Sequence, residues 1–345
     1  MLNLIQHLTS IVCRIDPETS SGWHKMRKRF MIKKLLEQKK CFKLICGAGN
    51  ENLAEVEKLV ALYAKAGCRF FDLNASEEVL AAAQKGLDFA IEKEFQKDYH
   101  FCVSVGTKND KHFKKARINS DKCKRCEQCI RVCPQKAINQ YFIVEKYKCI
   151  GCSRCFDACK HGAMEIYSEN KLIDLSTFQL PHLSCVELHV SDEESALAMW
   201  DELCGNFHPM MSICLARGVF SDEKTAELLK KMVAKRPPYT VVIKADGNPM
   251  SGGSDDFETT LPAVEMGKFV QSLNLPVYLL LSGGTNSKTA ELAKLHAVNI
   301  NGVSVGSFAR KIVREYIERE DFLTNQQVFE EALAIAKNLI NFFQV

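Results

Sequence analysis

Eight cysteines in the middle of the chain have the spacing of ligands for iron–sulfur clusters. They form two runs of the pattern Cys-x2-Cys-x2-Cys-x3-Cys, and the second run starts 26 positions after the first. Three cysteines spaced three residues apart can wrap a short loop around one cubane cluster, whereas the fourth reaches the neighbouring cluster. The sequence therefore predicts two [4Fe–4S] clusters. One would be bound by Cys123, Cys126, Cys129 and Cys159, and the other by Cys149, Cys152, Cys155 and Cys133.

Zinc and disulfides are the alternatives for these cysteines. Zinc favours two separated Cys-x2-Cys pairs, which supply four tetrahedral ligands to each ion, and disulfides require an oxidising compartment. Iron–sulfur ligation is favoured because the repeat continues beyond the cysteines, where Ala137-Ile138 is matched by Ala163-Met164. Residues 117–168 as a whole resemble the bacterial two-cluster ferredoxin.

The composition is that of a globular protein with room for a second, larger domain. The chain has 345 residues, of which 46% are hydrophobic and 26% are charged, and its formal charge of +4 gives little reason to expect a nucleic-acid partner. No segment reaches the length of a membrane span, and the first residues lack the features of a signal peptide. Oxygen-sensitive clusters, together with eight further cysteines, predict a reducing cytoplasm.

Outside the cysteine-rich part, short apolar segments alternate with amphipathic helical patterns. Eight such strand–helix units, with strands that have the pattern of buried parallel strands, predict a (β/α)8 TIM-type barrel. A doubly wound open sheet is the alternative. We expect strands at 41–46, 68–73, 101–105, 184–190, 211–215, 239–245, 276–281 and 300–305. We expect helices at 52–66, 77–93, 193–204, 223–234, 263–273 and 288–296, followed by a helical tail.

The predicted barrel is interrupted after its third strand by the ferredoxin-type module. The expected parts are a helical lead-in (1–40), the first part of the barrel (41–113), the module (114–168) and the remainder of the barrel (169–345). The strands of such a barrel open at their C-terminal ends onto one face, so the module would deliver electrons toward the barrel mouth. An insertion tolerated without function is the alternative. We expect the lead-in to be a helix that covers the barrel bottom with a solvated basic face; a patch for nucleic acid or an acidic partner is the alternative. Its basic residues are Lys25, Arg27, Lys28, Arg29, Lys33 and Lys34.

Two turns of small residues near the end of the chain predict a phosphate-binding site. Small residues let backbone N–H groups approach an anion closely, and the loops after strands seven and eight are the usual phosphate cradle of TIM-type barrels. The stretch looks like the phosphate site of flavin-binding barrels, which makes FMN a candidate cofactor. Simple turns and helix caps are the alternative. The residues are Ser282, Gly283, Gly284 and Thr285 after the seventh strand, and Gly306 and Ser307 after the eighth.

Other polar residues follow or end the predicted strands. Lys244 is a further candidate for contacting a flavin or a phosphate or forming a Schiff base, although an ion-paired lysine at the barrel rim is the simpler interpretation. The loop at 246–260 is either a lid over the mouth or an insertion. Asn50, Asn74 and Arg217 either line the same cavity or cap turns. We identify no Ser–His–Asp or paired-carboxylate arrangement, and we assign no histidine as a ligand, so catalytic residues stay unassigned.

Four short segments before the first cysteine run have distinctive sequences. They are Leu44-Ile-Cys-Gly-Ala-Gly-Asn50, Phe71-Asp-Leu-Asn-Ala75, Val103-Ser-Val105 and His112-Phe113-Lys-Lys-Ala116. This arrangement resembles the light-dependent period protein family of cyanobacteria, from about residue 40 to the C-terminal barrel segment. The resemblance implies a two-cluster redox-sensing protein that reports cellular redox state to the circadian clock. Residue by residue it adds only the eight cysteines already named.

Three functions are compatible with these features. The first is a cytosolic protein with two [4Fe–4S] clusters that acts in electron transfer or redox sensing with an electron-transfer or signalling partner protein. The second is an iron–sulfur flavoenzyme, an oxidoreductase that binds FMN or another phosphate-bearing ligand at the barrel mouth. The third is a scaffold in which the clusters only hold the module together. The sequence does not decide whether the chain is an enzyme.

Overall fold

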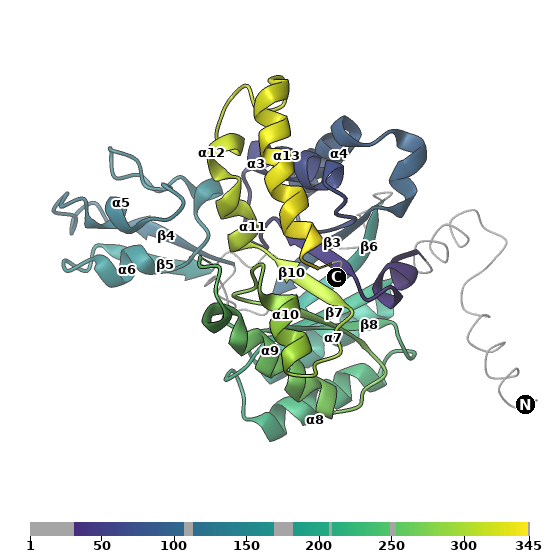
Figure 1. Cartoon of the computed structure of the whole chain (residues 1–345). Coiled ribbons are helices and arrows are strands. Elements are labelled where there is room, and N and C mark those ends of the chain that lie inside the picture. The colour runs from purple at the N-terminus through teal and green to yellow at the C-terminus, as the bar shows by residue number, and fades with distance from the viewer. Residues whose placement is uncertain (1–30, 107–112, 169–181, 207–208, 249–252, 344–345) are drawn as a thin grey trace, which may run out of the picture.

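Eight parallel strands close into a barrel in the computed structural model, which describes residues 31–106, 113–168, 182–206, 209–248 and 253–343 (Figure 1). The strands follow one another around the barrel in sequence order, and the last pairs with the first. The predicted TIM-type barrel with a module inserted after its third strand is therefore confirmed. The strands are β1 (Cys41–Ile45), β2 (Phe70–Asn74), β3 (His100–Gly106), β6 (Leu183–His189), β7 (Met210–Ala216), β8 (Val241–Asp246), β9 (Tyr278–Ser282) and β10 (Gly302–Val305).

Helices cover the outside of the barrel (Figure 1). Several begin at a polar residue whose side chain accepts a hydrogen bond from the backbone N–H three residues on, which satisfies an otherwise unpaired donor. Asn52, Ser76, Ser221 and Asn325 cap helices in this way. The helices are α3 (Leu53–Lys65), α4 (Glu77–Ala90), η1 (Lys93–Asp98), α7 (Glu193–Asn206), α8 (Asp222–Ala234), α9 (Phe257–Ser272), α10 (Thr289–Leu295), α11 (Ser307–Ile312), α12 (Arg314–Ile317) and α13 (Gln326–Asn341).

Helix α9 begins earlier than the sequence predicted. We expected it to start at residue 263, directly after a proline, but it starts at Phe257 and carries Pro262 inside it. The Asp256 carboxylate accepts a hydrogen bond from Thr259 N over 2.7 Å and so caps the helix upstream of the proline. The predicted loop at 246–260 is therefore shorter, and residues 249–252 lie outside the described part of the chain.

The inward-facing side chains of the barrel form layers of different character. The layer at the N-terminal ends of the strands is apolar, and the helical residues 31–37 pack against it with the fully buried Ile32 and Leu36. Part of the expected lead-in thus covers the barrel bottom. Its remaining basic residues, Lys25, Arg27, Lys28 and Arg29, lie outside the described residues. The apolar layer consists of Cys41, Phe70, Cys102, Cys185, Met210, Val242, Tyr278 and Leu280.

The layer directly above it is polar. Inward positions recur every second residue along a strand, so the next inward position after each apolar one should also face the barrel axis. Two lysines, two carboxylates and four serines form this layer, one from each strand, and all are buried. They are Lys43, Asp72, Ser104, Glu187, Ser212, Lys244, Ser282 and Ser304.

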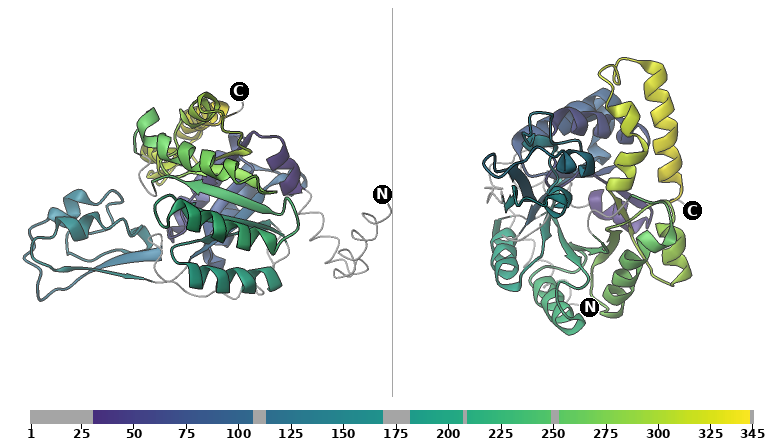
Figure 2. Two further views of the ribbon diagram at one scale, coloured as in Figure 1. Left: turned by 90° about the horizontal axis from the view of Figure 1, so that it is seen from below. Right: turned by 90° about the vertical axis from the view of Figure 1, so that its left-hand side faces the viewer.

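The inserted module is a small unit built on an antiparallel hairpin. Strand β4 (Lys114–Ile118) pairs with β5 (Met164–Ser168), and between them lie the short helices α5 (Gln128–Val132), η3 (Lys146–Lys148) and α6 (Arg154–Ala158). Figure 2 shows the module projecting from one end of the barrel, with the helix at 31–37 at the opposite end. In the described ranges, no helix is long and apolar enough to cross a membrane.

Candidate functional site

The two halves of the module present their cysteines in the same local geometry. Helices α5 and α6 each follow a residue in the left-handed conformation, Glu127 and Ser153, both with φ of 63°. This turn ends the loop that carries the first two cysteines of each run and places the third in the helix. The two halves of the sequence repeat therefore fold into two copies of one cysteine-presenting loop.

The eight thiols fall into two groups. Burial, followed by the neighbouring Cys149, Cys152 and Cys133, raises the pKa of Cys155 to about 12, so these four thiols lie close to one another. Burial likewise raises the pKa of Cys129, to which Cys123 and Cys126 contribute. Cys133 from the first run thus lies with the second run, as the interleaved ligand pattern requires. We call Cys133, Cys149, Cys152 and Cys155 the inner set. The outer set consists of Cys123, Cys126 and Cys129, together with Cys159, which the sequence pattern assigns to it.

The surroundings of these thiols fit ligation of iron–sulfur clusters. Backbone N–H groups donate to cysteine sulfur at Ala116→Cys149 (3.4 Å), Ala137→Cys133 (3.3 Å) and Ala163→Cys159 (3.3 Å). Hydrogen bonds of this kind stabilise thiolate ligands and tune cluster potentials. None of the described cysteines forms a disulfide. The two sets can each hold one cubane cluster.

The inner set lies against the barrel. The backbone of Gly151 has φ of 66°, and a Cβ at this position would lie 2.1 Å from the carbonyl oxygen of Lys114 in β4, so only glycine fits. Ile150, between Cys149 and Cys152, lines a pocket at the barrel mouth. The cysteine loop of the inner set therefore forms part of the wall of that pocket.

A buried lysine fastens this loop to the barrel. The ammonium group of Lys115, only 2% exposed, donates to the carbonyl oxygens of Cys149 (2.8 Å) and Lys146 (3.1 Å) in the module. It also donates to the carbonyl oxygen of Gly49 (2.7 Å) and lies 3.7 Å from the carboxylate of Glu51, both in the loop after β1. One positive charge thus joins an inner-set ligand to a loop that lines the barrel mouth.

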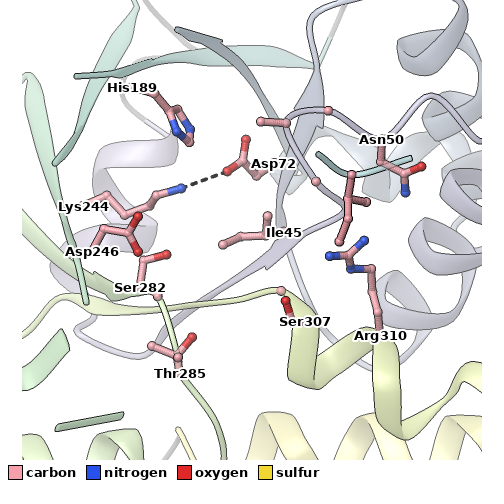
Figure 3. Close-up of a pocket in the computed structure, with 17 residues that line it drawn as sticks. Ile45, Asn50, Asp72, His189, Lys244, Asp246, Ser282, Thr285, Ser307 and Arg310 are labelled. Carbon is pink, nitrogen blue, oxygen red and sulfur yellow. Dashed lines mark hydrogen bonds and ion pairs between the residues drawn. The ribbon is translucent and has the colours of Figure 1, made fainter. Parts of the chain in front are cut away.

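The barrel-mouth pocket collects every residue that the sequence singled out for a phosphate-bearing ligand. Its volume is about 80 Å³, and Asn50 and Arg310 line it on the side opposite Lys244, Asp246 and Ser282 (Figure 3). The predicted residues at its wall are Ser282, Gly283, Gly284, Thr285, Gly306, Ser307 and Lys244.

Below the pocket, the polar layer of the barrel forms a network of buried ion pairs. Lys43 Nζ lies 2.7 Å from Glu187 and 3.4 Å from Asp72. Lys244 Nζ lies 3.3 Å from Asp72 and contacts Glu187 as well. The serine hydroxyls of Ser104 and Ser212 donate to Asp72 and Glu187 over 2.6 and 3.0 Å. Two positive and two negative groups thus compensate one another inside the barrel.

The network keeps Lys43, Lys244 and Glu187 charged. Burial acts to lower the pKa of Lys43, but Asp72, Cys102 and Glu187 raise it well above its ordinary value. Burial acts to raise the pKa of Glu187, but Lys244 and Lys43 lower it well below its ordinary value. The rim lysine expected from the sequence is therefore an ion-paired ammonium group on the pocket floor.

This network and its neighbour His189 were not predicted from the sequence. The available signal was a charged residue in the middle of several otherwise apolar strands. His189 Nε2 lies 3.1 Å from Glu187 Oε1, and donor atoms of Glu187, His189 and Cys214 lie within 4.8 Å of one another. Because two ammonium groups already contact Glu187, a metal cation there would be repelled, and we assign no metal to this group.

Three other strand-end residues take different roles. Asn50 lines the pocket, and its amide donates to Cys46 O over 3.0 Å. Asn74 donates to Ala48 O over 2.6 Å and so supports the loop after β1. Arg217 is not among the described residues that line the pocket, and it pairs on the surface with Asp222 and Glu265 at 3.3 and 3.5 Å.

Comparison with known proteins matches both parts of the chain. The 4Fe-4S dicluster domain family matches residues 71–177, and the light dependent period A C-terminal domain family matches residues 179–342. Light dependent period A from Synechococcus elongatus is 30% identical over 296 residues, which cover 80% of this chain and 82% of that protein. The chain belongs to the light dependent period A family.

A shorter match covers a small part of this family member. The electron transport protein HydN of Escherichia coli is 43% identical over 49 residues, 13% of this chain and 28% of that protein. Together with the family match, this similarity identifies an iron–sulfur electron-transfer protein.

Solved structures that resemble this member of the light dependent period A family are similar in fold only. The YdjI aldolase of Escherichia coli is 11% identical and has a TM-score of 0.45, with 91% of this chain and 95% of that chain covered. The tryptophan synthase alpha chain of Legionella pneumophila is also 11% identical, with a TM-score of 0.43 and coverage of 90% and 98%.

Proposed function

We propose that this protein binds two [4Fe–4S] clusters and senses redox state, relaying the charge of the inner cluster to the barrel mouth through Lys115. The outer set would face a partner protein in electron transfer, since Cys126 is exposed. The inner set lies against the barrel through Ile150 and Lys115. Electron exchange and its readout would thus occur at opposite sides of the module.

The observation that carries this proposal is the contact of Lys115 with both parts of the molecule. A [4Fe–4S] cluster, when bound, exchanges single electrons and so changes its charge by one. The Lys115 ammonium group donates to the carbonyl of the inner-set ligand Cys149 and is 2% exposed, so solvent screens it poorly. A change of charge at the inner set therefore acts on Lys115, and through Lys115 on Gly49.

The test is a redox titration of the anaerobically purified protein, followed by electron paramagnetic resonance. Replacement Lys115→Met removes a positive charge beside the inner set, so we expect one of two midpoint potentials to fall while the other stays unchanged. Lys115→Arg keeps the charge and should retain most of the wild-type potential.

Arg117→Gln is the matched control, because Arg117 lies two residues further along β4 and pairs with Glu165 at 2.7 Å on the surface. It should change neither potential by a comparable amount. Equal shifts of both potentials in Lys115→Met, or no shift, would contradict the proposal. A protein with a single cluster would contradict its first clause.

A second candidate is an iron–sulfur flavoenzyme with FMN at the barrel mouth. It is supported by the gathering of all seven predicted residues at one pocket, beside the inner set. The size of the pocket argues against this candidate, because its volume of about 80 Å³ is well below the roughly 300 Å³ of the smallest typical small-molecule sites. Flavin released by acid from the gently purified protein, at about one per chain, would support this candidate. Absence of flavin would reject it.

A further inference from the structure

Arg310 is a buried cation without a counter-ion. Its side chain is only 6% exposed, and its Nε atom has no hydrogen-bond partner. In the part of the chain that the structure describes, no carboxylate forms an ion pair with its guanidinium group. Burying an unpaired charge is costly. A ligand that supplies negative charge and hydrogen-bond acceptors would remove this cost.

Arg310 lies where two pockets adjoin. It lines the barrel-mouth pocket together with Asn50 on one side of the cavity (Figure 3). It also lines a second pocket of about 320 Å³ between the module and α11, which shares Ile150 and Ser307 with the first. This second pocket, which we call the cationic pocket, is of the size of a small-molecule site.

The cationic pocket has the charge of an anion-binding site. Four cations line it, namely Arg154 from the module and Arg310, Lys311 and Arg314 from the barrel, and no carboxylate is among its described lining residues. Arg314 is partly engaged, since it donates to Pro134 O over 3.0 Å and to Gln135 Oε1 over 3.2 Å. Arginine guanidinium groups bind phosphate in a bidentate manner, and Arg310 has unused donors for it.

The barrel-mouth pocket that Arg310 lines also has small residues in its wall, on the side of Asp246. Gly283 has φ of 72°, and a Cβ there would lie 1.9 Å from Asp246 Oδ1. The turn at Gly283 therefore requires glycine, because any side chain would clash with Asp246. The acidic group Asp246 lies across the pocket from Arg310 (Figure 3). This polarity directs the anionic part of a ligand toward Arg310 and away from the pocket floor.

We propose that Arg310, assisted by Arg154 and Arg314, binds the phosphate group of a small-molecule ligand in the cationic pocket, and that reduction at the inner set weakens this binding. The second clause rests on the proposed function. It follows from geometry, because the ligand cysteine Cys152 lines the cationic pocket. Added negative charge at Cys152 and its partners repels a phosphate group bound beside them.

The coupling is reciprocal. If reduction weakens binding of the anion, then the anion makes reduction more difficult by the same factor. A tenfold change in affinity corresponds to a shift of about 59 mV in the midpoint potential for one electron. The structure therefore predicts that an anion at Arg310 lowers one of the two potentials.

The first experiment measures binding of inorganic phosphate and of pyrophosphate to the oxidised full chain by calorimetry in a phosphate-free buffer. Arg310→Gln should reduce the affinity at least tenfold, and Arg154→Gln several-fold. Arg217→Gln is the matched control, because Arg217 lies near the barrel mouth but pairs with Asp222 and Glu265 and should not affect binding. Binding that Arg310→Gln leaves unchanged, or absence of binding to the wild type, would overturn the assignment.

Two readouts separate this inference from the proposed function. Iron content and circular dichroism show whether Arg310→Gln folds and carries its clusters; if it does not fold, Arg154→Gln, exposed on the module, decides the outcome. The potentials are then measured with and without pyrophosphate, with cationic viologen mediators that do not compete for the site. A shift of one potential supports the coupling. Binding at Arg310 without any shift would retain the anion site and reject its coupling to the inner set.

Discussion

The module and the barrel use the same residue, cysteine, in opposite ways. In the barrel, Cys41, Cys102 and Cys185 stand in β-strands and are fully buried within an apolar layer. In the module, cysteines stand on loops and at short helices, where left-handed turns at Glu127 and Ser153 bring them together. The comparison shows that the backbone around a cysteine determines whether its thiol can act as a metal ligand or only packs in the core. A thiol in a barrel strand packs among apolar side chains, whereas the module thiols lie near one another and can bind one metal cluster together.

The largest expected effect comes from removing an inner-set ligand. Cys152→Ser should reduce the iron content from about eight to about four atoms per chain, because one cubane cluster loses a ligand. The barrel counterpart Cys102→Ala should keep its full iron content and lose only about 1 kcal/mol of stability. Iron analysis of both variants after anaerobic purification makes the comparison. Equal iron loss in both would remove the distinction between the two cysteine classes.

Removal of a buried ion-pair partner should have the next largest effect, which is on the free energy of unfolding. Lys43→Met leaves Glu187 and Asp72 with one ammonium group fewer, so we expect the free energy of unfolding to fall by about 3–5 kcal/mol. Urea unfolding followed by tryptophan fluorescence measures it. The double variant Lys43→Met/Glu187→Gln should recover part of the loss, and Lys231→Met, at an exposed pair with Glu227, should have little effect. A loss no greater than that of Lys231→Met would show that the network does not stabilise the barrel.

The same network predicts a pH dependence. The pKa of Glu187 lies well below its ordinary value in the folded protein, because Lys244 and Lys43 outweigh the effect of burial. Its stabilising contribution is therefore present above the unfolded pKa of about 4.3 and is lost as the pH falls through the folded pKa. Glu187→Gln should be less stable than the wild type by a constant amount from pH 8 to about 5. This gap should narrow below about pH 4, and a gap that widens there would contradict the assignment.

Thiol reactivity gives the smallest effect. Burial raises the pKa of Cys68 to about 12, so at pH 8 roughly one Cys68 thiol in ten thousand is ionised. Iodoacetamide should leave Cys68 unmodified both in the native protein and after chelation of iron. The module thiols should become reactive once iron is removed. Mass spectrometry of the labelled peptides distinguishes the two classes, and fast labelling of Cys68 in the folded chain would count against its burial.

The sequence was sufficient for the fold and for grouping Cys133 with the second cysteine run, for identifiable reasons. Apolar strands alternate with amphipathic helices, and each strand begins and ends within two residues of its predicted bounds. Ligand spacing is local, so the spacing alone assigns eight cysteines to two groups. The predicted start of α9 was wrong, because residues up to 260 were assigned to the preceding loop although the Asp256 cap starts the helix at Phe257.

What the sequence could not provide depends on closure of the barrel. Lys43, Asp72 and Glu187 come from three distant strands, and only the closed barrel places them at one level. Arg310 has the sequence pattern of an ordinary polar residue in a short helix, whereas the structure places it buried at the junction of two pockets. Lys115 lies in a segment that indicated the family. Its contact with Gly49 could not be predicted, because the two residues are 66 positions apart in the sequence.

The central claim, that redox state is relayed from the inner set to the barrel mouth, is tested most directly by hydrogen exchange. Amide exchange of residues 47–50 is compared between the oxidised and the reduced protein, in the wild type and in Lys115→Met. The account predicts a redox-dependent difference in the wild type that disappears in the variant. Identical exchange of this loop in the oxidised and reduced wild type would contradict it.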